Sequence, residues 1–170
     1  MRLYKGKIEV IARDLITTLI NEGDIDVANE EEARLDVEAV LREYLRLDRE
    51  LVEEAKNRME MRGLGYGHLG QVRNQLAKER GQPTNEETLP YLLDQILNIL
   101  FHSNNVDEIY AEDTHLRTKI TPILRKHMEV DTDLDREVRS KIKHLEEGTA
   151  SFDVEYSKVM SQIKKRMGLT

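Results

Sequence analysis

Residues 40–48 have the sequence VLREYLRLD, and residues 123–131 (ILRKHMEVD) match it at a constant offset of 83, with the same Leu-Arg pair after the first residue and the same final Asp. Residues 72–81 (VRNQLAKERG) and 159–168 (VMSQIKKRMG) form a second matched pair, and both contain Gln-x-x-Lys-x-x-Gly. Because the matched stretches occur in the same order, the sequence predicts a tandem duplication. The predicted units are residues 1–81 and 82–170, as two domains or as one continuous domain.

Each unit is expected to contain three helices. In the first unit, apolar residues at steps of three and four predict a helix that ends near Asn21, where Gly23 and acidic residues supply turn chemistry. A longer helix is expected over about residues 29–61, with acidic residues in its first turn, where the helix dipole favours them. No convincing strand is found. The predicted fold class is therefore all-α: a tandem pair of related three-helix units packed as a helical bundle.

The second unit carries clear helix boundary signals. Thr84 and Glu87 have the spacing of a capping box, which predicts a helix from there to about His102. Pro122 suits the first turn of a helix that begins near Thr121. That helix is expected to end at Gly148 and to be kinked or divided near residues 131–133, because Asp and Thr side chains compete for backbone hydrogen bonds.

An apolar seam is expected along both long helices, and in it Tyr44 of the first unit corresponds to His127 of the second. Burial of an imidazole disfavours its charged form, so His127 is a candidate pH-sensitive position. A structural histidine held by a hydrogen bond is the alternative interpretation.

Composition and charge exclude several classes of protein. The chain has 170 residues, with 26 Lys and Arg against 33 Asp and Glu, and its formal net charge is −7. This balance disfavours nonspecific binding to nucleic acid or anionic lipid. The absence of Cys excludes disulfides, thiolate metal sites and Cys nucleophiles. Because no apolar run suits a membrane span or a signal peptide, the sequence predicts a soluble, cytoplasmic protein without membrane contact.

Two motifs share letters with known sites but not their context. Residues 65–70 (GYGHLG) match the dinucleotide fingerprint, yet a helix and not a strand is predicted before them, so a flexible linker is the preferred interpretation. The Asp-x-Asp-x-Asp run at residues 131–135 resembles the start of a calcium loop. It is followed by Arg136 where that loop needs Gly, and Ile142 stands where it needs Glu. No cofactor is predicted from either motif.

The histidines give no recognisable ligand set. Glu108, Asp113 and His115 could assemble a metal site with His102, but a polar loop is the preferred interpretation. No catalytic pair or triad can be distinguished among the acidic residues, and no small-molecule substrate is identified. The sequence therefore assigns no catalytic, metal or cofactor-binding residue.

The favoured function is a non-catalytic helical protein–protein interaction or scaffold module, with a protein partner or self-association. The candidate partner-binding residues lie in the glycine-rich linker and in the last helix: Gly65, Tyr66, Gly67, His68, Phe152, Asp153 and Tyr156. Core packing is the alternative for Phe152 and Tyr156.

Two functions from other classes remain open. One is a nucleic-acid-associated factor that binds through a focal basic patch, for which residues 117–126 and 158–166 are the best candidates. The solvated-face interpretation is preferred for both patches. The other is a metal-dependent hydrolase that uses scattered acidic residues and histidines.

Several stretches together resemble a bacterial family catalogued as domain of unknown function 507. They include GDIDV at residues 23–27, NEEEA at 29–33 and the tail FDVEYSK at 152–158. The resemblance covers essentially the whole chain, although the first unit has GLGYGH at residues 63–68 in place of the aromatic-Asp-Val ending. It implies a small, helical bacterial protein and carries no activity, cofactor or catalytic residue.

Overall fold

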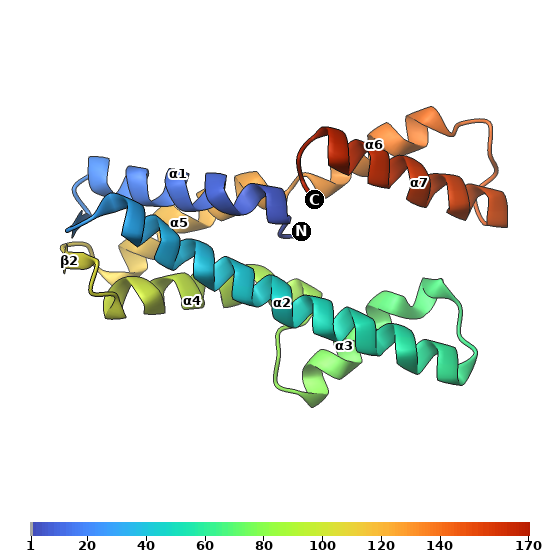
Figure 1. The fold of residues 1–170 in the computed structure, drawn as a ribbon, viewed down its shortest axis with the longest axis horizontal. Helices are drawn as coiled ribbons and strands as arrows, with labels where there is room; N and C mark the ends of the chain where they lie inside the picture. The colour runs from blue at the N-terminus through green and yellow to red at the C-terminus, as the bar shows by residue number, and fades with distance from the viewer. Residues whose placement is uncertain (1) are drawn as a thin grey trace.

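The computed structural model describes residues 2–170, with all of their side chains except those of Tyr66, Asp131 and Thr132. Helices dominate this range (Figure 1). The elements in chain order are the short 3₁₀ turn η1 (Lys5–Lys7), α1 (Ile8–Asn21), β1 (Ile25–Val27), α2 (Glu30–Arg62), η2 (Tyr66–His68), α3 (Leu69–Glu79), η3 (Asn85–Glu87), α4 (Thr88–His102), β2 (Val106–Ile109), α5 (Asp113–Met128), α6 (Asp131–Lys141) and α7 (Ala150–Arg166). None of the described helices combines the length and apolarity needed to span a bilayer.

Helices α1, α2, α4 and α5 form a base with one continuous core. Its fully buried side chains come from both predicted units, for example Leu15 and Leu41 from the first and Ile96 and Ile120 from the second. Within a unit α1 packs on α2 and α4 on α5, and between units α2 packs on α4 and α1 on α5. The two predicted units therefore bury their main apolar faces against each other, which gives the helical bundle that the sequence predicts.

A two-stranded antiparallel sheet closes the end of the base, so the prediction that the chain lacks strands was wrong. Strand β1 pairs with β2, with Ile25 opposite Ile109 and Val27 opposite Val106. The strands are three and four residues long and carry acidic residues. Such short segments have too few residues to show the alternation of a strand, and each finds its partner only in the other unit.

The first long helix follows its prediction, whereas its counterpart does not. Helix α2 begins after Asn29, whose side chain accepts a hydrogen bond from the Glu32 backbone N–H, and it ends at Gly63 in the left-handed conformation (φ 65°). The predicted bounds of the second long helix, Thr121 and Gly148, were wrong, because α5 already begins at Asp113 with Pro122 in its interior and α6 ends at Lys141. Pro122 lies on the exposed face, where water can satisfy the carbonyl that its ring leaves unpaired.

The expected division of that second long helix is confirmed. Helix α5 ends at Met128 and α6 begins at Asp131, and α6 in turn ends at Lys141. The division reorients the chain, so that α6 packs on α7. In the first unit α2 continues without a break and packs on α3.

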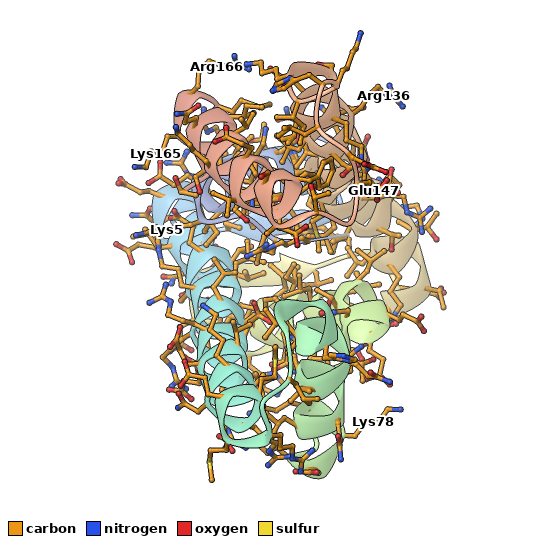
Figure 2. The ribbon with its side chains drawn as sticks, turned by 90° about the vertical axis from the view of Figure 1, so that its right-hand side faces the viewer. Lys5, Lys78, Arg136, Glu147, Lys165 and Arg166 are labelled. Atoms are coloured by element: carbon orange, nitrogen blue, oxygen red, sulfur yellow. The ribbon has the colours of Figure 1, made fainter. Side chains whose placement is uncertain are left out.

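Two helical hairpins project from the end of the base opposite the sheet (Figure 1). We call the C-terminal half of α2 with α3 the first arm, and α6 with α7 the second arm. Each arm has its own small core, which for the first arm includes Leu51 and Leu76 and for the second Val138 and Ile163. In Figure 2 Lys78 of the first arm and Arg166 of the second lie at opposite ends of the view, so the arms diverge from the base.

The segment before α1, residues 2–7, connects the base to the second arm. The backbone N–H of Arg2 donates to the Met128 carbonyl (3.3 Å), and that of Gly6 donates to the Leu169 carbonyl (3.0 Å). Leu3 is buried in the base core, and Tyr4 in the core of the second arm. This N-terminal segment therefore lies at the junction of the base and the second arm.

Candidate functional site

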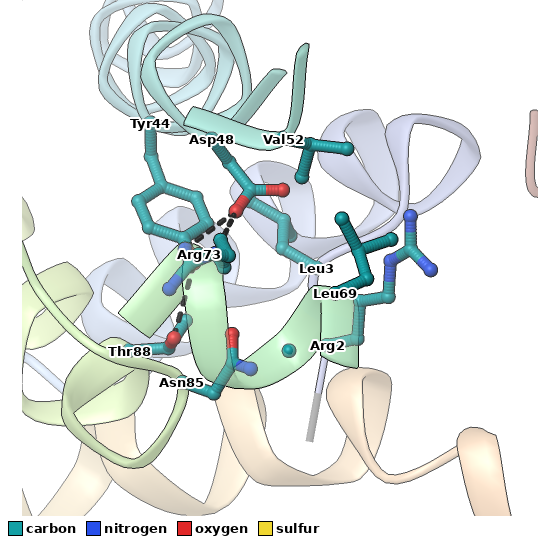
Figure 3. Close-up of a pocket in the computed structure, with 10 residues that line it drawn as sticks. Arg2, Leu3, Tyr44, Asp48, Val52, Leu69, Arg73, Asn85 and Thr88 are labelled. Atoms are coloured by element: carbon teal, nitrogen blue, oxygen red, sulfur yellow. Dashed lines mark hydrogen bonds and ion pairs between the residues drawn. The ribbon is translucent and has the colours of Figure 1, made fainter. Parts of the chain in front are cut away.

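Two adjoining recesses lie at the junction of the arms, on either side of the N-terminal segment. The first recess, of about 370 Å³, is lined by Arg2, Leu3, Tyr44, Asp48, Val52, Leu69, Gly70, Arg73, Asn85 and Thr88 (Figure 3). The second recess, of about 300 Å³, is lined by Arg2, Leu3, Tyr4, Lys5, Leu45, Asp48, Arg49, Val52, Lys164, Leu169 and Thr170. Arg2, Leu3, Asp48 and Val52 are common to both, so the two recesses form one concave surface.

Helical spacing places the side chains of this surface. Tyr44, Asp48 and Val52 follow one another at steps of four on α2, so they share a face of that helix. Leu69 and Arg73 have the same spacing on α3 and face α2 across the first arm. The site therefore combines the N-terminal segment, α2, α3, the η3–α4 segment and the end of α7.

Arg73 is a structural cation in this site. Its guanidinium donates to Asp48 Oδ1 from Nε (2.9 Å) and from Nη2 (2.5 Å), and from Nη1 to the carbonyl of Pro83 (3.3 Å). Only 3% of Arg73 is exposed. Sequence reasoning missed this residue, although its place on the apolar face of α3, four residues after Leu69, could have identified it. Because a buried charge needs partners, Arg73 fixes α3 against α2 and the start of α4.

Tyr44 joins α2 to the start of α4. The predicted capping box of Thr84 and Glu87 is present, and it places Thr88 so that its Oγ1 lies 3.0 Å from the Tyr44 hydroxyl. Burial raises the pKa of the Tyr44 phenol above its ordinary value, and the hydrogen bond with Thr88 acts in the opposite direction. The hydroxyl therefore remains neutral and serves to hold the two helices together.

Positive side chains surround the second recess. Arg2 and Lys5 come from the N-terminal segment, Arg49 from α2 and Lys164 from the last turn of α7. The Arg2 guanidinium carbon lies 5.5 Å from the centre of the Tyr4 ring, and the Lys164 Nζ lies 5.2 Å from it. These are cation–π contacts, which hold both cations close to the buried tyrosine.

The glycine-rich candidate segment joins the two helices of the first arm, and it directly precedes Leu69 and Gly70, which line the first recess. Gly65, Gly67 and His68 are exposed between α2 and α3, and the Tyr66 side chain lies outside the described part of the chain. The segment joins two helices, so it lacks the strand that a dinucleotide fingerprint requires. Met61, which is 88% exposed, lies beside it.

The other candidate residues begin α7 in the second arm. Phe152 is buried in that arm's core, as the core-packing alternative predicts, and its ring stacks on Tyr156 with 5.9 Å between centroids. The Tyr156 hydroxyl donates to Asp135 Oδ1 (2.6 Å). This hydrogen bond holds the pKa of the Asp135 carboxyl below its ordinary value, and Arg139 adds to the effect. Asp153 is exposed at the helix start.

His127 occupies the buried seam position that the sequence predicts. Only 7% of the residue is exposed, and its Nε2 lies 3.0 Å from Asp14 Oδ2 on α1. The contact joins the two units through α1 and α5. A pH-dependent role for His127 stays a prediction.

The two histidines considered for a metal site have other partners. His115 Nε2 lies 3.3 Å from Oδ1 of the buried Asp24, and His102 Nδ1 lies 2.7 Å from the carbonyl of Asn98. Among the described residues, no group of three or more His, Asp and Glu side chains could hold a metal ion. The acidic run at residues 131–135 includes Asp131, whose side chain is outside the described set.

Comparison with known proteins identifies a family. No curated protein matches the sequence. One family, described as protein of unknown function (DUF507), matches residues 1–169, which is nearly the whole chain. The resemblance drawn from the loop, acidic and tail stretches is thereby confirmed. The chain belongs to the DUF507 family, whose function is unknown.

Proposed function

We propose that the protein is a non-catalytic helical interaction module and that a protein partner binds where its two arms meet. The observation that carries the proposal is the divergence of two helical hairpins from one end of a single base, with a concave surface at their junction. Residues from five separate segments line this surface, which is typical of a preformed recognition site.

The base suits the role of a rigid support. Its continuous core fixes α2 and α5, and the buried Arg73–Asp48 pair fixes α3 on α2. On the other side, the Gly6–Leu169 hydrogen bond holds the end of α7 against the N-terminal segment. A surface that is fixed before binding loses less conformational entropy when a partner binds.

The ends of the arms offer additional contact area. Met61 and Leu64 are exposed large apolar side chains beside the glycine-rich linker of the first arm, and Val154 is exposed on the second arm. Exposed apolar side chains near a concave surface are typical of protein interfaces. The candidate residues Gly65, Gly67, His68 and Asp153 belong to these outer regions.

Two cations of the predicted basic patch at residues 117–126 already form ion pairs with carboxylates, which disfavours the nucleic-acid alternative. In the stretch 117–126, Arg117 pairs with Asp94 and Asp113, and Lys119 with Glu22 and Asp24. Cations that already have carboxylate partners contribute less to phosphate binding, because those partners must be displaced. A protein partner is therefore the better proposal.

A photo-crosslinking experiment tests this function. A photoreactive phenylalanine analogue replaces Val52 in the recess, and in a matched control it replaces the exposed Glu108 in β2 at the opposite end of the base. Crosslinking is carried out in lysate from the source cells, with and without nuclease treatment. We expect a discrete protein adduct from the Val52 position and not from the Glu108 position. Equal adducts at both positions, or adducts that disappear with nuclease treatment, would contradict the proposal.

A further inference from the structure

Three of the cations around the second recess, Arg2, Lys5 and Arg49, differ from most arginines of the chain in having no carboxylate partner among the described residues. On α2, for example, Arg46 pairs with both Glu43 and Glu50. Within the part of the chain that the structure describes, no carboxylate oxygen lies within 4.0 Å of a side-chain nitrogen of Arg2, Lys5 or Arg49. Among the described lining residues, Asp48 is the one acidic side chain, and it pairs with Arg73.

Local helix geometry does not explain this concentration of positive charge. Lys164 lies in the last turn of α7, where the helix dipole favours a cation. Arg2 and Lys5 precede α1, however, and Arg49 lies in the middle of α2, far from either helix end. Their convergence is a product of the tertiary fold, in a chain whose net charge is −7. An anionic group bound here would relieve the repulsion between these cations.

Apolar side chains complete the surface. Leu3, Leu45, Val52 and Leu169 line the second recess together with the cations. Figure 3 shows Leu3, Val52 and Leu69 around the first recess, with the Arg2 guanidinium at its edge and no bond drawn to the other residues. The surface therefore complements a ligand that presents an apolar side chain next to a negative charge.

From this complementarity we infer that the arm junction recognises a short acidic segment of the partner protein, in which carboxylates flank an apolar residue. The inference rests on the proposed function and adds the chemistry of the partner. Carboxylates of the segment pair with Arg2, Lys5 and Arg49, and its apolar side chain contacts Leu3 and Val52. Bidentate hydrogen bonding to the guanidinium groups supplies orientation as well as affinity.

The surroundings favour a short peptide over a nucleic-acid strand. Glu50, Glu53 and Glu54 follow Arg49 on α2 and border its outer side together with Arg80. These acids repel a long polyanion that extends beyond the recess, whereas a short segment does not reach them. The volume of about 300 Å³ holds a few side chains, at the lower limit of ordinary ligand pockets.

Fluorescence anisotropy with the full chain tests the inference. The probe is a fluorescein-labelled synthetic peptide that repeats Asp-Leu-Glu, and the control peptide repeats Asn-Leu-Gln. We expect the acidic peptide to bind and the neutral one to bind at least about tenfold more weakly. Raising the ionic strength from about 0.05 M to about 0.5 M shortens the Debye length and is expected to weaken binding.

Surface variants locate the binding. Arg2→Ser and Arg49→Ser are each expected to weaken acidic-peptide binding about fivefold, and the charge reversal Arg49→Glu more strongly. Arg62→Ser is the matched control, because Arg62 is an exposed arginine at the end of α2 that lines neither recess. This control variant is expected to bind within about twofold of the unaltered chain. Thermal melts confirm that each variant is folded.

Three results would overturn the inference: no binding of the acidic peptide, equal losses in Arg49→Ser and Arg62→Ser, or single-stranded DNA that binds more tightly with the same dependence on Arg2 and Arg49. Each leaves the crosslinking result at Val52 unaffected. A specific protein crosslink without acidic-peptide binding would refute the partner chemistry alone. Failure of the crosslink together with failure of the peptide would refute the proposed function as well.

Discussion

Replacing Gly6 with alanine places a methyl group where the backbone of the C-terminal turn already lies. A Cβ atom at residue 6 would stand 1.5 Å from the Gly168 carbonyl oxygen, 2.6 Å from its carbonyl carbon and 2.8 Å from the Leu169 Cα. All three atoms belong to backbone, so no side-chain rotation can relieve the contact. Either the N-terminal segment or the turn at Gly168 has to move.

The cost of that movement follows from the contacts that are lost. The hydrogen bond from the Gly6 N–H to the Leu169 carbonyl contributes about 1 kcal/mol. Leu169 is 1% exposed in the core of the second arm, and partial exposure of a leucine costs about 1–3 kcal/mol. We expect Gly6→Ala to lower the free energy of unfolding by about 2–4 kcal/mol, or the melting temperature by roughly 5–15 °C.

Thermal melting and hydrogen exchange together test this reasoning. Gly65→Ala is the matched control, because no atom lies within 4 Å of a Cβ placed at residue 65 and its φ is not positive. We expect reduced exchange protection in α6 and α7 for Gly6→Ala and nearly native protection in α1 and α4. The close approach of the two termini is refuted if Gly6→Ala has the same melting temperature as Gly65→Ala and its α7 amides keep native protection from hydrogen exchange.

Further substitutions test the other contacts. Asp48→Ala leaves the buried Arg73 cation without its carboxylate and is expected to cost about 3–5 kcal/mol in urea unfolding, whereas loss of less than about 1 kcal/mol would contradict the role of the pair. Tyr156→Phe removes the bond that lowers the pKa of Asp135. That bond stabilises the fold above the ordinary carboxyl pKa, and the stabilisation is lost as pH falls through the lowered value, so the deficit of about 1 kcal/mol at pH near 7 should shrink in acid. A melting difference that stays constant as the pH is lowered would refute this pH dependence. His127→Tyr introduces the residue found at the matched seam position of the first unit. Its melting temperature is expected to lie within a few degrees of that of the unaltered chain, and a much lower melting temperature would refute the seam assignment.

Local signals in the sequence predict much of the fold. The cap at Asn29, the capping box at Thr84 and the periodic apolar residues of α1 each depend on neighbours within a few positions. They are therefore visible without knowledge of the tertiary structure. The burial of His127 agrees with its sequence match to Tyr44, which is also buried, because matched apolar spacing places both residues on the core-facing side of their helices.

The features that sequence reasoning missed depend on distant partners. Strand β1 becomes a strand only because β2 lies beside it, and Pro122 is compatible with α5 only because that face is exposed. The recess likewise unites Arg2, Arg49 and Lys164 from remote parts of the chain. The sequence interpretation instead favoured glycine-rich and aromatic stretches, whose features are local, and a role in binding for those stretches stays a prediction.

The shared core of the base has a consequence for the order of events during synthesis. When the first half of the chain leaves the ribosome, α1 and α2 can pack on each other, but the apolar surfaces that α4 and α5 cover have no partner because those helices do not yet exist. Strand β1 likewise has no pairing partner until β2 has been synthesised. His127, in contrast, can contact Asp14 as soon as it is made, because Asp14 precedes it in the chain. The final cooperative step therefore depends on contacts of long sequence separation, which close slowly. A nascent chain halted before α5 therefore leaves exposed the apolar faces of α1 and α4 that α5 covers in the finished fold.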